Sequence, residues 1–200
     1  MNRTLVRRIL LPFAATAVLA LAAGCGGDDI GGMDPGSGAQ TTASASGSSA
    51  TFNDADVTFA QNMIVHHQQA VEMADLAATR AASGGIKTLA TQIKAAQQPE
   101  IDKMTGWLTA WGKPTEPAGG HGGHSMPGMM STGDMDKLKA ASGAAFDKQF
   151  AQMMIDHHNG AIEMAREVQK NGSNPDVKKL AADIEKTQQA EVTTLQKFVS

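Results

Sequence analysis

The hydrophobic positions between residues 52 and 200 recur at the spacing of α-helices. In residues 59–77 apolar side chains return every four or seven positions, and Gly84-Gly85 would end this helix. A second apolar stripe covers residues 86–108 and contains Pro99, which should kink or split its helix. No alternating run is long enough to indicate a strand, so the pattern predicts an all-α protein.

The same two helices recur later in the chain as a second copy, at a constant offset of 91 residues. Residues 59–74 and 150–165 are identical at most positions, and the offset continues without a gap into the next helix. There, residues 89–101 match residues 180–192, with Ala190 in the place of Pro99. Two tandem helical hairpins of similar length predict a four-helix bundle.

Each repeat places a Met–His–His–Met pattern on the apolar face of its first helix. With Met63 at zero, His66 lies at about −60° and His67 at about +40° around the helix axis. Met73 lies at about −80°, so the set occupies one third of the circumference. Buried imidazoles need hydrogen-bond partners or a metal ion. The predicted ligands in the bundle are Met63, His66, His67, Met73, Met154, His157, His158 and Met164.

These residue types favour copper. Thioether sulfur is soft and favours Cu(I), whereas imidazole also suits Cu(II) and zinc. No cysteine thiolate is available for a zinc-type site, and neither His pair has the Glu three residues earlier that a di-iron bundle needs. Four inward polar residues are candidate hydrogen-bond partners of the imidazoles: Gln97, Gln188, Asp56 and Asp147.

The segment that joins the repeats, residues 113–135, is rich in Gly, His and Met. Methionines in a Gly-rich loop have no core to fill, and His and Met at short spacing can wrap one ion. The segment therefore predicts a metal-capturing arm, with a flexible linker carrying incidental Met as the alternative. Its candidate ligands are His121, His124, Met126, Met129 and Met130.

The first 51 residues are expected to lie outside the bundle. A basic start, an apolar run over residues 9–23 and small residues before Cys25 resemble a bacterial lipoprotein signal, with a plain signal peptide as the alternative. Lipid on Cys25 would anchor the protein at the outer face of the cytoplasmic membrane or in the periplasm. The predicted domains are a signal peptide (1–24), a disordered tether (25–51) and the bundle (52–200), the last divided into repeat one (52–112), the Met/His linker (113–135) and repeat two (136–200).

The net charge is −3 and the 17 Lys and Arg are scattered, which argues against nucleic acid as a partner. Metal ions and, through the lipid, the membrane are the predicted partners. The sequence leaves homo-oligomerisation open.

The motif Met-Ile-x-His-His-x-x-Ala-x-x-Met-Ala occurs twice and resembles the bacterial family named domain of unknown function 305. Pro127-Gly128-Met129-Met130 and Gln97-x-x-Glu100-Ile101 add to the resemblance, which covers about residues 52–200. The resemblance implies a ferritin-like four-helix bundle. Some members are periplasmic copper-tolerance proteins that bind copper or silver through Met and His, which implies the same role here. Gln69, which stands where the second copy has Gly160, and Pro99 depart from the pattern and predict weaker binding by the first repeat.

The sequence thus predicts an exported lipoprotein that binds copper, as Cu(I) or Cu(II), or silver, for sequestration or metal tolerance, and that is not an enzyme. A metal-dependent redox enzyme is one alternative and would need an open coordination position and a pocket. A structural or interaction bundle with a metal-free network of buried His is the other.

Overall fold

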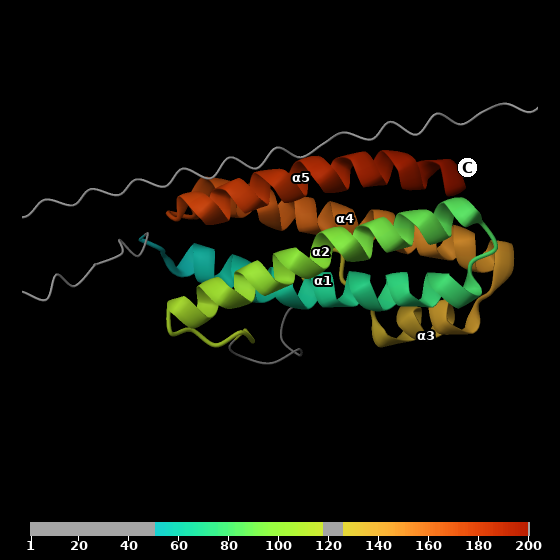
Figure 1. Cartoon of the computed structure of the whole chain (residues 1–200), viewed down its shortest axis with the longest axis horizontal. Coiled ribbons are helices and arrows are strands. Elements are labelled where there is room, and N and C mark those ends of the chain that lie inside the picture. The colour runs from blue at the N-terminus through green and yellow to red at the C-terminus, as the bar shows by residue number, and fades with distance from the viewer. Residues whose placement is uncertain (1–50, 118–125, 200) are drawn as a thin grey trace, which may run out of the picture. The chain divides into compact units, whose positions relative to one another are not determined.

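The bundle is formed by four long helices, α1 (Asp54–Arg80), α2 (Gly84–Ala110), α4 (Gly143–Asn171) and α5 (Pro175–Leu195), in the order predicted (Figure 1). The structure is a computed structural model that describes residues 51–117 and 126–199. The described residues belong to one compact unit, and a 3₁₀ turn, η2 (Gln196–Phe198), follows α5. The all-α four-helix bundle is confirmed. Among the described helices, none is long and apolar enough to cross a membrane.

The two repeats form two hairpins, α1–α2 and α4–α5, which meet mainly through α1 and α4. Asp56, in the first turn of α1, accepts backbone hydrogen bonds from residues 173–174 at 3.0 and 3.1 Å. Asp147, near the start of α4, accepts them from residues 82–83 at 3.1 and 2.8 Å. Each contact maps onto the other at the offset of 91, so the hairpins are related by a pseudo-twofold axis. The start of each of α1 and α4 therefore lies beside the end of the other, and these two helices are antiparallel.

One predicted helix boundary is wrong, and a split predicted as one outcome at Pro99 does not occur. Helix α1 ends at Arg80, and Gly84 opens α2 instead of closing α1, because the Ser83 hydroxyl accepts the backbone N–H of Gly85 at 3.2 Å and caps α2. Pro99 does not split α2, which is continuous from Gly84 to Ala110. Pro99 is exposed, and the apolar stripe on both sides of it is buried against one core, so tertiary packing holds the helix together.

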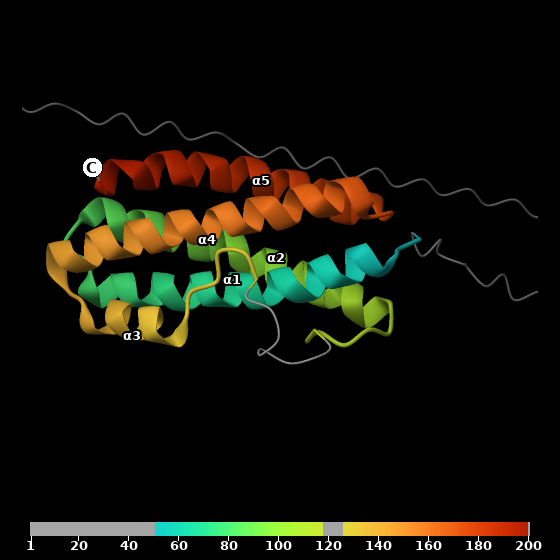
Figure 2. The same cartoon turned by 180° about the vertical axis from the view of Figure 1, so that it is seen from behind.

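A short helix, α3 (Thr132–Ala140), crosses the boundary that the sequence placed between the linker and repeat two. Ser131 caps it by accepting the N–H of Asp134 at 3.1 Å, and Met135 and Leu138 are buried against the bundle. Figures 1 and 2 show α3 beside α1. From the end of α3 the chain passes into α4.

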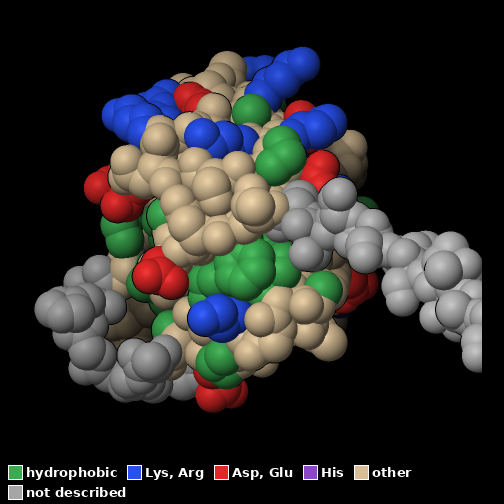
Figure 3. Space-filling model, turned by 90° about the vertical axis from the view of Figure 1, so that its left-hand side faces the viewer, with side chains coloured by type: hydrophobic (Ala, Val, Ile, Leu, Met, Phe, Trp, Pro, Cys, Tyr) green, Lys and Arg blue, Asp and Glu red, His purple; other side chains and the backbone are tan. Residues whose placement is uncertain are grey.

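The core is divided into two apolar clusters along the bundle. One is built around Phe146 and Phe150, and the other around Met63, Met104 and Leu108. At the end of the bundle that carries the start of α1, Phe52 stacks on Trp111 with ring centroids 4.5 Å apart. Figure 3 views that end and shows hydrophobic side chains at its centre and no described histidine on the surface.

Candidate metal centre

All four bundle histidines are fully buried and gather in one cluster between α1 and α4. The rings of His66 and His157, which are equivalent in the two repeats, lie 3.7 Å apart between centroids and are tilted by 36°. The centroids of His157 and His158 are 6.4 Å apart. The two repeats therefore contribute to one shared cluster.

The four predicted methionines lie on either side of the histidines. Met63 and Met164 belong to one apolar cluster, and Met73 and Met154 belong to the other. Because α1 and α4 are antiparallel, each pair combines one methionine from each repeat. The result is a layered core in which a band of imidazoles separates two pairs of thioethers. All four side chains are buried, and Met164 is the most exposed of them at 8%.

One histidine of each repeat is hydrogen-bonded to a glutamate of its own hairpin. His67 Nε2 lies 2.8 Å from Glu100 Oε2, and His158 Nε2 lies 2.7 Å from Glu191 Oε2. The sequence prediction did not include these glutamates among the site residues. Their signal was present, because Glu100 and Glu191 are matched at the repeat offset.

The remaining histidines have different surroundings because the linker docks on one side of the cluster. His66 Nε2 donates to the carbonyl oxygen of Pro127 at 3.1 Å. His157, its equivalent, has no hydrogen-bond partner at either ring nitrogen among the described residues. Residues 126–130, here called the docked segment, rise from the start of α3 across α1 toward α4 (Figure 2).

The docked segment explains why Gln69 and Gly160 differ between the repeats. The Gln69 side chain accepts the N–H of Met130 at 2.7 Å and donates to the Met130 carbonyl at 3.0 Å. At Gly160 the backbone of the docked segment lies directly against α4, since an added Cβ would come within 2.7 Å of Gly128 N. Gly128 itself has φ +75°, which favours glycine. Gln69 and Gly160 therefore hold the linker, a role that the sequence did not reveal.

Eight buried side-chain atoms of the four histidines, Gln97 and Gln188 have no hydrogen-bond partner among the described residues. Five are ring nitrogens, namely Nδ1 of all four histidines and Nε2 of His157, and three are side-chain atoms of Gln97 and Gln188. The predicted hydrogen bonds from Gln97 to the imidazoles are not formed, and Gln188 Oε1 is also unpaired. An unsatisfied buried polar atom costs about 1–3 kcal/mol, so eight of them would cost as much as the whole stability of a typical domain. Water or an ion could serve as the partner of these atoms.

The electrostatics of the cluster keep two of its imidazoles neutral. Burial, and next the neighbouring His67, lower the pKa of His66 to about 3. Burial, and next His66, lower the pKa of His157 well below its ordinary value. The backbone of His66 slightly raises the pKa of His157, although it does not have the geometry of a hydrogen bond to that ring. A neutral imidazole keeps a lone pair, which is what metal ligation requires.

Other predicted residues lie elsewhere. Asp56 and Asp147 do not contact the imidazoles, because both carboxylates accept hydrogen bonds from the hairpin turns at the bundle ends. Met126, Met129 and Met130 are partly buried in or beside the docked segment, with Met130 packed on the core. Three candidates fall outside the described residues, together with the signal peptide and tether: His121, His124 and Cys25.

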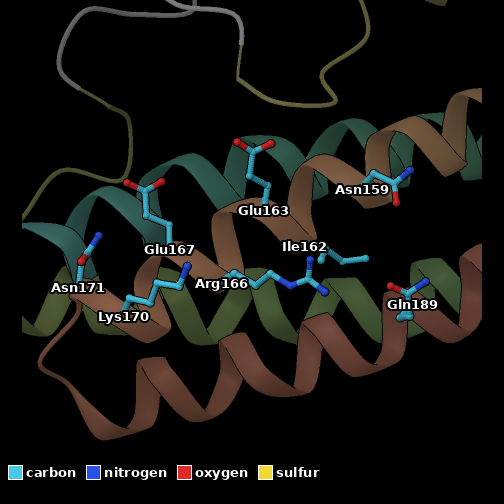
Figure 4. A pocket seen from close by; sticks show the side chains of 8 residues that line it. All are labelled: Asn159, Ile162, Glu163, Arg166, Glu167, Lys170, Asn171 and Gln189. Atoms are coloured by element: carbon cyan, nitrogen blue, oxygen red, sulfur yellow. The ribbon is translucent and has the colours of Figure 1, made fainter.

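In the parts of the chain that the structure describes, no three His, Cys, Asp or Glu side chains converge around one point as they would around a bound ion. The groove in Figure 4, on the outer side of α4 and α5, contains Glu163, Arg166 and Gln189 and none of the predicted ligands. Met164 lines a separate surface pocket beside Asp54 and Glu167.

Fold and site together define a duplicated four-helix bundle with a core of histidine and methionine. The chain belongs to the DUF305 family, a domain of unknown function whose model matches residues 56–199. No curated protein gives a significant match to the sequence.

Solved structures of the family superpose on this one. A DUF305 fragment from Deinococcus radiodurans is 28% identical, with a TM-score of 0.67, and the match covers 74% of this chain and 96% of that one. A Streptomyces coelicolor DUF305 protein, provisionally described as secreted, is 32% identical over 70% and 89% of the two chains, with a TM-score of 0.66. CopM in its Cu(II)-bound form is 34% identical over 72% and 95%, with a TM-score of 0.64, and CopM has also been solved with Cu(I) and with Ag bound.

Proposed function

We propose that this protein is an extracytoplasmic copper-binding protein that holds Cu(I) or Cu(II), and also Ag(I), for sequestration or metal tolerance. The observation that carries the proposal is the band of four buried histidines between two pairs of buried methionines. Five of the ring nitrogens have no hydrogen-bond partner in the part of the chain that the structure describes. Relatives support it, since CopM binds copper and silver and a Streptomyces coelicolor member is described as secreted. Export through the N-terminal signal and lipid attachment at Cys25 are part of the proposal.

The donor set fits copper better than zinc or iron. Thioether sulfur prefers Cu(I) and Ag(I), and imidazole accepts both copper oxidation states. An ion bound in the bundle would give the ring nitrogens of His66, His67, His157 and His158 the partner that the described residues do not supply. Glu100 and Glu191 place negative charge beside the cluster, which lowers the cost of burying a cation.

Storage suits this cluster better than turnover. The four imidazoles have no exposed surface, so a substrate larger than an ion cannot contact them without rearrangement of the helices. We therefore propose a binding protein and not an oxidoreductase. A steady-state assay of the copper-loaded protein for Cu(I) or small-molecule oxidation tests this, and sustained turnover would contradict it.

A metal-free structural bundle is the second candidate. It is favoured by the hydrogen bonds that His66, His67 and His158 already make and by the absence of three converging His, Cys, Asp or Glu ligands in the described residues. It predicts that no metal binds or stabilises the protein.

Calorimetric titration with Ag(I), Cu(I), Cu(II) and Zn(II), alongside thermal melts, separates the two candidates. Residues 26–200 contain the whole compact unit and suit this experiment. Saturating Ag(I) at 100 times Kd should stabilise the protein by about 2.7 kcal/mol. The variants His66→Ala/His67→Ala and His157→Ala/His158→Ala should lose this effect.

Variants with Met→Leu test the sulfur atoms separately, because this exchange keeps the side-chain volume and costs less than about 1.5 kcal/mol. Met63→Leu/Met164→Leu and Met73→Leu/Met154→Leu should bind Ag(I) more weakly while remaining folded. Matched linker variants carry Met126→Leu/Met129→Leu/Met130→Leu or His121→Ala/His124→Ala. If only the linker variants lose binding, the site lies in the linker, and if no ion binds the wild type, the copper proposal is wrong.

A further inference from the structure

The two hairpins carry the same carboxylate–imidazole pair at the same place. Glu100 accepts from His67 and Glu191 accepts from His158, in both cases across 33 residues and at 2.7–2.8 Å. The two histidines are fully buried, whereas the glutamate side chains are 20% and 13% exposed. Each glutamate thus reaches from the edge of the core to the outer nitrogen of one imidazole.

The pairing is maintained although the neighbouring sequence differs. Glu100 follows Pro99, whereas Glu191 follows Ala190, and yet the two distances agree within 0.1 Å. Neither carboxylate forms an ion pair with Lys or Arg among the described residues, and its only ionic partner there is the imidazole. The position of each glutamate is therefore tied to its histidine.

These contacts determine which nitrogen of each ring can bind an ion. Carboxylate and carbonyl oxygens accept hydrogen bonds and cannot donate them, so Nε2 carries the hydrogen in His67 and His158. The same logic applies to His66, whose Nε2 donates to the carbonyl of Pro127 at 3.1 Å. In all three rings Nδ1 is buried and has no partner within residues 51–117 and 126–199. His157 has no such constraint at either nitrogen.

We propose that Glu100 and Glu191 are positioning residues that direct His67 and His158 to ligate the metal through Nδ1. The inference rests on the proposed metal-binding function and deepens it. Pro127, through its carbonyl, directs His66 in the same way. A carboxylate on the far side of a ligating imidazole fixes the orientation of the ring and raises its basicity, and loss of such a partner typically costs 10–100-fold in metal affinity.

The test uses Ag(I) as the probe, because it is diamagnetic and does not change oxidation state. Long-range ¹H–¹⁵N spectra of histidine-labelled protein (residues 26–200) report the hydrogen on each ring nitrogen, before and after Ag(I) is added. In the metal-free protein, Nε2 of His66, His67 and His158 should be protonated. Ag(I) should then shift the Nδ1 resonances of these rings and leave Nε2 protonated. A shift of Nε2 in place of Nδ1 would overturn the proposal.

Two substitutions at each glutamate separate positioning from charge. Glu100→Gln and Glu191→Gln keep an oxygen acceptor, so ligation through Nδ1 should persist with affinity reduced less than in variants with Leu at these positions. Glu100→Leu and Glu191→Leu remove the acceptor and add no metal ligand, so the paired ring should show mixed tautomers and Ag(I) affinity should fall about 10–100-fold. Glu163→Gln and Glu163→Leu, on the exposed face of α4, are the matched controls and should bind Ag(I) as the wild type does.

The outcomes distinguish the two proposals. If the wild type binds no Ag(I), the metal-binding function fails and the ligation scheme fails with it. If the wild type binds Ag(I) but Glu100→Leu and Glu191→Leu match the Glu163 controls in affinity and tautomer, only the positioning role is overturned. Thermal melts of the metal-free variants confirm that each is folded before it is titrated.

Discussion

Gly160→Ala tests the contact between the docked segment and α4. A methyl group at Gly160 would lie 2.7 Å from Gly128 N and closer still to the carbonyl of Pro127, whereas ordinary contacts begin at 3.4 Å. The docked segment would have to retreat from α4 by at least 0.7 Å, the difference between these two distances. Both obstructing groups are backbone, so no side-chain rotation can relieve the clash.

The retreat should break three hydrogen bonds that hold the docked segment. These are the bond from His66 to Pro127 and the two bonds between Gln69 and Met130. At about 1 kcal/mol each, their loss costs about 3 kcal/mol. Alanine in place of glycine inside a helix returns about 1 kcal/mol, which leaves a net destabilisation of about 2 kcal/mol. For a domain of this size the melting temperature should fall by about 4–8 °C.

Gly106→Ala is the matched control. Gly106 lies within α2, is exposed, and has nothing within 4 Å of an added Cβ. This substitution should therefore stabilise the protein by about 1 kcal/mol through helix propensity alone. Urea unfolding of both variants measures the two effects with opposite expected signs. If Gly160→Ala is stabilising to the same extent as Gly106→Ala, the docked segment does not pack on α4 as described.

Three further perturbations test the stability of the metal-free bundle. His66 has a pKa of about 3 when folded and an ordinary value of 6.5, so the unfolded chain binds an extra proton between these pH values. The free energy of unfolding should therefore fall as the pH drops from 6.5, by about 1.4 kcal/mol per pH unit for His66, and His157 adds a loss in the same direction. Urea midpoints that stay constant from pH 7 to pH 5 would contradict this. Pro99→Ala should stabilise by about 1–3 kcal/mol, because Pro99 is exposed within a continuous helix and alanine restores an N–H donor; an unchanged urea midpoint would show that α2 does not need this donor. Asp56→Asn should destabilise the protein by about 2–4 kcal/mol, and more than Asp147→Asn does. The reason is that Asp56 Oδ2 accepts four hydrogen bonds, whereas the Asp147 carboxylate accepts two. Equal losses of stability in thermal melts of the two variants would argue against this difference.

The repeat made the bundle predictable from sequence. Because the two copies share one register, the helical period can be determined twice. This agreement located the helices and predicted that both His pairs face the inside of the bundle. Asp56 and Asp147 show the limit of that reasoning. Both lie on the inward face of their helix, at an angular position that suits the site. However, Asp56 comes ten residues before His66, which is about 15 Å along the helix axis. The prediction used the angular position around the helix and not the position along its axis. It therefore assigned to the site two carboxylates that hold the ends of the bundle.

Contacts between distant segments could not be predicted in this way. Glu100 and Glu191 meet their histidines across 33 residues, and a pattern within one helix does not report which neighbour a side chain reaches. The docking of Pro127 on His66 is equally invisible to periodicity, since the linker has none. The exchange of Gln69 for Gly160 was visible as a difference between the repeats, but its meaning required the position of the docked segment.

A single linker also explains why the two repeats cannot be equivalent. The chain crosses between the hairpins once, so only one side of the pseudo-twofold cluster can receive the docked segment. His66 thereby gains a carbonyl partner, whereas His157, at the equivalent position, has none among the described residues. Reorienting His157 would break no hydrogen bond, whereas reorienting any of the other three rings would break one. The cluster thus consists of three rings whose orientation a hydrogen bond at Nε2 fixes and one, His157, that is held by packing without such a bond among the described residues.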